Sequence, residues 1–346
     1  RISPIQLLSA LNVLLLQNLL QASTEGRYQL HAIVADYASR NFNEKSEHAN
    51  HSVRQAMHSK AVRYYLQQAA RNYPSRDNRL IISDVQPFIE AIWHLCQAKQ
   101  WQKAYDLAKK EYLFADLRRW REYAVLLELC QLLLPGNWHP KPLVASLIYS
   151  NLAWAYDMLG EKEEAKWNYQ EALGIFMKLM DRMGQGETLN NLGGVYLALG
   201  EKEKALSSYE EARRVRREVG DRKGEGVALY GLGSVYEIIG QQEKALEYYE
   251  EALYMKQEVG DQGEEGEMLL SIGALYFELR RYDAALAYVL RAREIFEEIQ
   301  SPLVDLAESR IAAIRRMVGD LEFAPLLAKV GPQVQQIVEK SLYESA

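Results

Sequence analysis

An internal repeat of 40 residues constrains the fold of this chain more than any other sequence feature. Four segments align at this period without insertion, and each carries a short motif that ends in a tyrosine. The motifs are Asn151-Leu152-Ala153-x-x-Tyr156, Asn191-Leu192-Gly193-x-x-Tyr196, Gly231-Leu232-Gly233-x-x-Tyr236 and Ser271-Ile272-Gly273-x-x-Tyr276. A constant period of this size indicates a solenoid of repeated units.

Each unit is expected to be a pair of helices. Apolar residues recur at helical intervals in two runs, and a glycine at which a helix can end in the left-handed conformation separates them. These glycines are Gly160, Gly200 and Gly240. Small residues such as Gly193 and Ala205 allow the paired helices to approach closely, while Tyr209 fills the space beside them.

Three aspartates occupy equivalent positions just before the next first helix: Asp181, Asp221 and Asp261. A carboxylate at such a position can accept hydrogen bonds from the unpaired amides of the first helical turn. We therefore interpret these residues as helix caps.

The order small, Tyr, Ala, Tyr, Ala resembles the signature of the tetratricopeptide repeat family. It is formed in one unit by Gly193, Tyr196, Ala205, Tyr209 and Ala212. The 40-residue unit is similar to the kinesin-light-chain and Leu-Gly-Asn variety. The resemblance implies an all-α fold, a right-handed superhelix of helical hairpins without catalytic activity of its own.

The resemblance covers residues 144–303, and we assign four repeats to 143–303. The last unit departs from the signature, with Arg280 in place of glycine and Val289 in place of tyrosine. Residues 304–346 keep helical periodicity but lose the signature, which is typical of capping helices at the end of an array.

The first 42 residues have a different pattern, which predicts helix, short strand and helix, as at the end of a winged-helix domain. The segment Gly26-Arg27-Tyr28-Gln29-Leu30-His31-Ala32-Ile33-Val34 resembles the end of the winged-helix module in NB-ARC proteins of the STAND class of signalling NTPases. The resemblance implies that His31 contacts the nucleotide diphosphate, although Ala32 replaces the aspartate of the strict motif. The alternative is a structural histidine bound to a backbone carbonyl.

Between these two parts, residues 43–60 are rich in Asn, His, Ser and charge and are predicted to form a polar linker. Residues 61–142 alternate apolar faces with short turns without the clean signature. We interpret them as an irregular helical adaptor of degenerate repeats, which ends at Pro135-Gly136-Asn137, with Pro140 and Pro142 just beyond.

The sequence contains no phosphate-binding loop of the Gly-x-x-x-x-Gly-Lys-Ser/Thr type, and no His-Glu-x-x-His or Gly-x-Ser-x-Gly motif. We therefore predict no enzyme activity, catalytic residue, metal or cofactor for this chain alone. Because it does not begin with methionine, we expect a fragment. The STAND resemblance implies that a full-length protein binds ADP or ATP with Mg and oligomerises through an upstream NTPase domain.

Charge is unevenly distributed along the chain. Residues 1–143 carry 18 basic and 12 acidic side chains, whereas residues 224–303 carry 6 and 16. The acidic array disfavours nucleic acid, and an acidic outer face is expected to include Glu210 and Glu250. No apolar run is long enough to span a membrane, and the two cysteines lack metal-ligand spacing, so we expect a cytoplasmic protein.

The leading functional hypothesis is a sensor array of a STAND NTPase that binds a protein or peptide on its concave face. The alternative is a free-standing scaffold that bridges protein partners without a nucleotide switch. Helical register predicts a concave wall formed by Ser150, Asn151, Trp154, Asp157, Glu187, Asn190, Asn191, Leu197, Tyr230, Ser234, Glu237, Leu270, Ala274 and Phe277. For any of these residues, packing between repeats is the alternative role.

Overall fold

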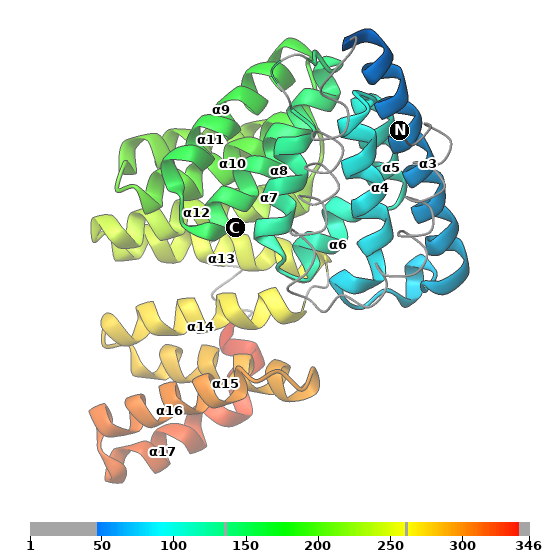
Figure 1. The fold of residues 1–346 in the computed structure, drawn as a ribbon. Helices are drawn as coiled ribbons and strands as arrows, with labels where there is room; N and C mark the ends of the chain where they lie inside the picture. The colour runs from blue at the N-terminus through cyan, green and yellow to red at the C-terminus, as the bar shows by residue number, and fades with distance from the viewer. Residues whose placement is uncertain (1–46, 135, 137, 260–261, 339–346) are drawn as a thin grey trace.

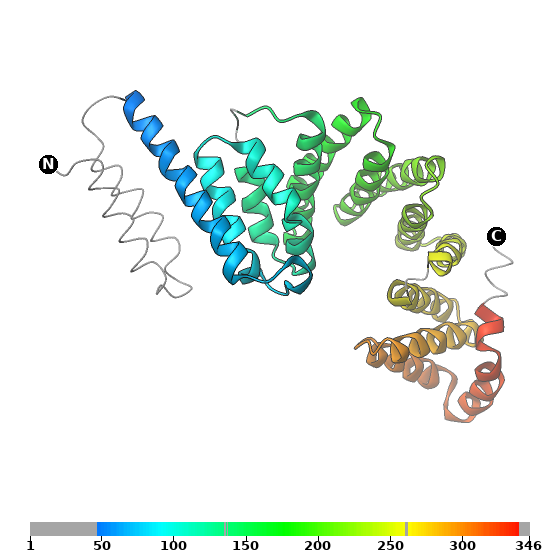
Figure 2. The same ribbon diagram turned by 90° about the vertical axis from the view of Figure 1, so that its right-hand side faces the viewer.

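The protein is described by a computed structural model that covers residues 47–338 except 135, 137, 260 and 261. Helices dominate the described residues, which contain no strand, and they follow one another along a curved arch (Figures 1 and 2). None of these helices is both long and apolar enough to cross a membrane. The winged-helix assignment of residues 1–42, including His31, falls outside the described residues.

From residue 47 to the repeats, the described part of the chain has five helices and two short 3₁₀ turns. They are α3 (Glu47–Asn72), the turns Arg76–Asn78 and Ile82–Val85, α4 (Gln86–Gln97), α5 (Trp101–Lys110), α6 (Leu113–Arg119) and α7 (Tyr123–Leu132). The polar linker predicted for residues 43–60 is wrong from Glu47 onward, because α3 is continuous there. Residues 47–60 contain neither glycine nor proline, and α3 packs along α4.

The four repeats form four helical pairs. Their helices are α8 (Pro142–Leu159), α9 (Lys162–Lys178), α10 (Arg182–Ala198), α11 (Lys202–Glu218), α12 (Arg222–Ile239), α13 (Gln242–Val259), α14 (Gln262–Glu278) and α15 (Tyr282–Glu298). Two further helices, α16 (Val304–Val318) and α17 (Asp320–Val330), pack on the last pair and close its core. The all-α superhelical fold predicted from the sequence is confirmed.

The turns within the pairs have the backbone conformation that the glycine positions predict. Gly160, Gly200 and Gly240 have φ angles of 86°, 76° and 84°. In the last pair Arg280 takes the same left-handed conformation, with φ of 59°. The turn geometry is therefore conserved along the array, even where a side chain makes this conformation less favourable.

Two of the predicted helix caps are confirmed. The Oδ1 atoms of Asp181 and Asp221 each accept a hydrogen bond of 3.0 Å, from the backbone N–H of Gly184 and Gly224 respectively. Each contact satisfies an amide of the first helical turn that has no partner within the helix. Asp261 lies outside the described residues.

A tyrosine ring joins consecutive repeats at the centre of the array. The side chain of Tyr209 is buried between Gly193 of α10 and Gly231 of α12. A Cβ atom would come within 2.7 Å of the ring at Gly193 and within 2.3 Å at Gly231. The two glycines therefore allow both first helices to pack against one ring.

The two cysteine thiols are free and buried, as the sequence predicts. Burial raises the pKa of Cys96 from 9.0 to about 12, and it raises the pKa of Cys130 further. At pH 8 the thiolate fraction of Cys96 is then about a thousandfold lower than that of a thiol with the ordinary value, since each pKa unit is a factor of ten.

We therefore expect both thiols to react with a water-soluble thiol reagent at pH 8 only when the protein is unfolded. The measurement is reagent consumption with and without denaturant. Fast labelling of the native protein would show that these helices open to solvent far more often than their packing indicates.

Candidate functional site

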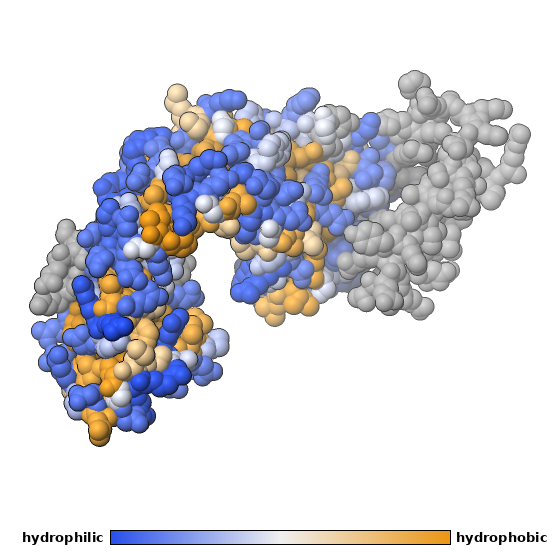
Figure 3. Space-filling view, turned by 90° about the vertical axis from the view of Figure 1, so that its left-hand side faces the viewer, coloured by the Kyte–Doolittle hydropathy of each residue, from blue (hydrophilic) through white to orange (hydrophobic). Residues whose placement is uncertain are grey.

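The first helices of the repeats form an inner layer. Helix α10 contacts both α8 and α12, whereas the second helices α9, α11 and α13 each pack between consecutive first helices. First helices that approach one another in this way lie on the inside of the curve, and second helices form the outer face. Figure 3 shows the hollow that this curvature leaves in the molecular surface.

The predicted concave residues divide into three groups by exposure. Glu187 and Glu237 are exposed. The half-buried residues are Ser150, Trp154, Asp157, Asn191, Leu197, Tyr230, Ser234, Ala274 and Phe277. Asn151, Asn190 and Leu270 are only 7–8% exposed, so their side chains are not available to a ligand in this conformation.

One row of the predicted wall holds the repeats together instead. Asn190 donates a hydrogen bond of 3.1 Å from Nδ2 to the backbone carbonyl of Gly224. The hydroxyl groups of Tyr230 and Ser271 lie 3.4 Å apart across the next interface. Leu270, in the same register, belongs to the core. For Asn190 and Leu270 this is the packing role that the sequence leaves open, whereas the Tyr230 ring stays partly exposed.

The central part of the wall is fixed by a hydroxyl network. The Tyr249 hydroxyl lies 2.7 Å from Glu237 Oε2 and 3.1 Å from Ser234 Oγ, and Ser234 donates a hydrogen bond to the backbone carbonyl of Tyr230. Burial, together with the nearby Glu237 carboxylate, raises the pKa of Tyr249. The Tyr249 hydroxyl therefore keeps its proton at neutral pH and donates it in a hydrogen bond to Glu237.

Aromatic side chains lie toward both ends of the wall. The Trp154 ring contacts Tyr123 edge-on at a centroid distance of 5.3 Å, and the Arg118 guanidinium lies 5.2 Å from its centroid. At the other end, Phe277 packs against Tyr282. Arg118 belongs to the adaptor, and the repeat pattern does not predict its approach to the wall.

The wall predicted from helical register leaves out several exposed apolar residues of the first helices. Val227 occupies the position of Glu187 in the next repeat, and it is 39% exposed. Ile238 and Met158 share another register position and are also exposed. A comparison of all side chains at each register position, apolar ones included, would have identified them.

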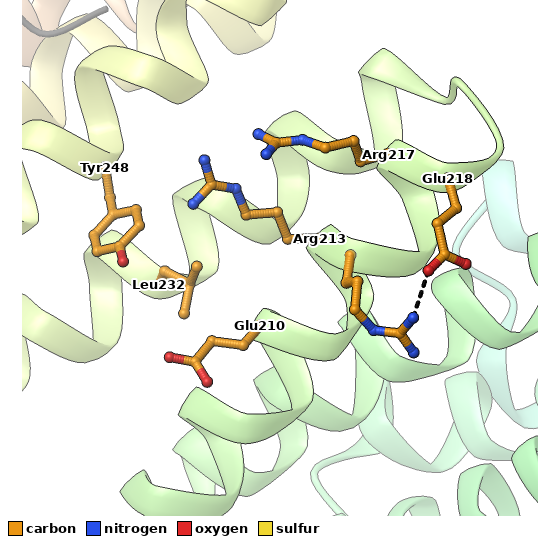
Figure 4. A pocket seen from close by; sticks show the side chains of 7 residues that line it. Glu210, Arg213, Arg217, Glu218, Leu232 and Tyr248 are labelled. Atoms are coloured by element: carbon orange, nitrogen blue, oxygen red, sulfur yellow. Dashed lines mark hydrogen bonds and ion pairs between the residues drawn. The ribbon is translucent and has the colours of Figure 1, made fainter.

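The outer face has a groove of about 380 Å³ between α11 and α13 (Figure 4). It is lined by Glu210, Arg213, Arg214, Arg217, Glu218, Leu232 and Tyr248. Arg213 pairs with Glu251, and Arg217 binds Glu225, a carboxylate that is only 1% exposed, at 2.6 Å. These arginines are thus matched by carboxylates.

Of the two glutamates that the sequence predicts for an acidic outer face, only Glu210 lies at the surface. Glu210 is exposed, but Glu250 is 4% exposed and accepts hydrogen bonds from the hydroxyl groups of Tyr276 and Tyr288 at 2.8 and 3.1 Å. Glu250 faces the neighbouring repeat because two tyrosine hydroxyls there require an acceptor. No group of three His, Cys, Asp or Glu side chains within the described ranges is arranged to hold a metal ion.

Comparison with known proteins supports the assignment of the repeats. Residues 147–176 and 184–258 match models of the tetratricopeptide repeat, so these segments are tetratricopeptide repeats. No curated protein matches the sequence significantly.

Solved structures of similar fold share little sequence with the chain. A Rap protein complexed with competence and sporulation factor has a TM-score of 0.51 and 14% identity over 86% of this chain and 99% of that one. Aspartyl phosphate phosphatase F from Bacillus subtilis has a TM-score of 0.50 and 13% identity, over 90% and 80%.

A third similar structure is a Signal Transduction ATPase with Numerous Domains, with a tetratricopeptide repeat sensor, from Pyrococcus horikoshii. Its TM-score is 0.51 and its identity 16%, over 88% of this chain and 55% of that one. At these identities the likenesses establish the fold of tandem helical hairpins, which is typically a non-catalytic protein-interaction module.

Proposed function

We propose that this chain binds an extended segment of a protein or peptide on the inner wall of its repeats. The observation that carries this proposal is the combination of accessible polar groups and half-buried aromatic rings on one face of the array. The side chains of Asn191 and Glu187 make no hydrogen bond or ion pair with other described residues, and Trp154, Tyr230 and Phe277 contribute partly exposed rings to the same wall. An amide side chain can pair with a peptide backbone, and aromatic rings provide anchors.

The array is further proposed to be the sensor of a STAND-type NTPase. The fold likeness to a sensor-bearing ATPase, which extends over most of this chain but about half of that one, supports the proposal by analogy. In such a protein an upstream domain would bind ADP or ATP with Mg and oligomerise, and His31 would contact the diphosphate.

The test of the inner wall uses a peptide selected against the intact chain from a displayed random library. The double variant Asn191→Ala with Tyr230→Ala is expected to weaken binding of that peptide about tenfold, or 1.4 kcal/mol. Tyr230 is only partly exposed, which limits the effect. The control Glu171→Ala with Glu203→Ala changes two exposed residues of the second helices.

Calorimetry on both double variants gives the dissociation constants. Normal affinity in the inner-wall variant, together with lost affinity in the control, would place the binding surface on the second helices and overturn the proposal.

The nucleotide-switch proposal has a separate test in a full-length protein. There, His31→Ala is expected to weaken retention of ADP, measured as the fraction of nucleotide that co-purifies, and to raise basal signalling. Unchanged nucleotide occupancy would leave His31 as a structural residue, without bearing on the inner wall.

A further inference from the structure

The signature tyrosines of the second and third repeats each have a lysine of their own chain beside the ring. Lys204 Nζ lies 5.5 Å from the centroid of the Tyr196 ring, and Lys244 Nζ lies 5.1 Å from that of Tyr236. Each lysine comes from the second helix of the same pair. A cation within about 6 Å of an aromatic face is attracted by the electrons of the ring.

The first repeat has the equivalent tyrosine, Tyr156, but a glutamate in place of the lysine. Glu164 occupies the position of Lys204 and Lys244, and none of the described residues places a cation over the Tyr156 ring. The carboxylate of Glu164 is exposed and forms no ion pair within the described part of the chain. An aromatic face and an uncompensated carboxylate therefore lie where the other two repeats have a lysine.

A groove of about 570 Å³ lies at this place, on the outer face between α7 and α9. It is lined by Gln131, Leu134, Tyr149, Leu152, Tyr156, Glu163, Glu164, Trp167 and Asn168. The Trp167 side chain is 54% exposed and meets Tyr149 edge-on at 5.9 Å. Gln131 donates a hydrogen bond of 3.1 Å to the Tyr156 hydroxyl, which fixes this ring between the helices.

The groove has no basic lining residue. Lys166 pairs with Glu163, but Lys166 does not line the groove, and Glu164 remains as an unpaired negative charge. Tryptophan and tyrosine are the aromatic side chains that bind cations most strongly. The lining is therefore complementary in charge and in surface to a basic side chain with an apolar stem.

The groove between α11 and α13 corresponds to this one two repeats later, and there the chain itself supplies a basic side chain. Leu232, which lines that groove, is equivalent to Leu152. There the Arg213 guanidinium lies 6.0 Å from the Tyr248 ring centroid (Figure 4). The same guanidinium pairs with Glu251. In the later groove the chain supplies the arginine, whereas the first groove is lined by aromatic, acidic, amide and apolar side chains and by no cation.

We propose that the groove between α7 and α9 binds an arginine or lysine side chain from a basic segment of a partner protein. Tyr156 and Trp167 contact the cation and its stem, and Glu164 provides the opposite charge. This site lies on the outer face, separate from the inner wall, and does not depend on the function proposed for that wall.

The test is calorimetric titration of the intact chain with an acetylated, amidated tetra-arginine peptide, with the tetra-glutamine peptide as a neutral reference. Glu164→Lys introduces the residue that the second and third repeats already carry. We expect it to raise the dissociation constant of tetra-arginine tenfold or more. A tenfold change corresponds to about 1.4 kcal/mol of binding free energy. Trp167→Ala, at an exposed position, is expected to weaken binding to a similar extent with an unchanged circular dichroism spectrum.

The matched control is Glu247→Lys, the same change in charge at an exposed position of α13 outside both grooves. We expect it to change the affinity about twofold at most in physiological salt, where distant charges are screened. Equal losses in Glu164→Lys and Glu247→Lys would mean diffuse attraction to an acidic protein and would overturn the proposal. Normal binding by Trp167→Ala would overturn it as well.

Discussion

Replacing Tyr209 with alanine is expected to lower the free energy of unfolding by about 3–5 kcal/mol, the range found for the loss of a large buried aromatic side chain. The ring is 7% exposed and lies between Gly193 and Gly231. Neither glycine has a side chain that can move into the space, so the substitution leaves a cavity between two repeats. The cost therefore includes lost contacts on both sides of the interface.

Urea unfolding followed by circular dichroism measures this loss, and Tyr254→Ala is the control. Tyr254 is 38% exposed on α13, so its truncation is expected to cost about 0.5 kcal/mol or less. Hydrogen exchange should show faster opening mainly in α10, α11 and α12, because each repeat contacts its neighbours. A loss spread evenly along the array, or equal losses in the two variants, would contradict this account.

Two glycine-to-alanine substitutions are expected to change stability in opposite directions. At Gly231 a Cβ would lie 2.3 Å from a Tyr209 ring carbon, and overpacking of this kind costs about 1–3 kcal/mol. At Gly194 the nearest neighbour of a Cβ is the Tyr209 hydroxyl at 3.5 Å, an ordinary contact. There alanine is expected to stabilise the helix by about 0.5–1 kcal/mol.

The measurement is the urea concentration at the unfolding midpoint of each single variant. The slope of the unfolding free energy against urea concentration must be the same in both variants, so that the midpoints report stability. Both glycines lie in the interiors of first helices, so the intrinsic helical preference is the same at the two sites. The difference in sign therefore reports the packing of Tyr209 alone. If both substitutions stabilised the protein, the contact between this ring and α12 would be looser than the structure indicates.

Local features of the chain were predictable because they depend on residues close together in the sequence. The 40-residue period determined the helical pairs, and Gly160 and Asp181 determined where helices end and begin. The burial of Cys96 follows from helical apolar spacing in the same way. Residues 47–60 are helical despite their polar composition, because they contain neither glycine nor proline and α3 packs along α4.

The role of each side chain on the inner and outer faces was decided only by the tertiary structure. The same register position is a joint between repeats at Asn190 and part of the core at Leu270. Glu250 is a buried acceptor, whereas Glu210, one repeat earlier, is exposed. The period fixes which residues are equivalent, but it does not fix the distance between neighbouring helices. That distance depends on the side chains that meet across each interface, which come from different repeats.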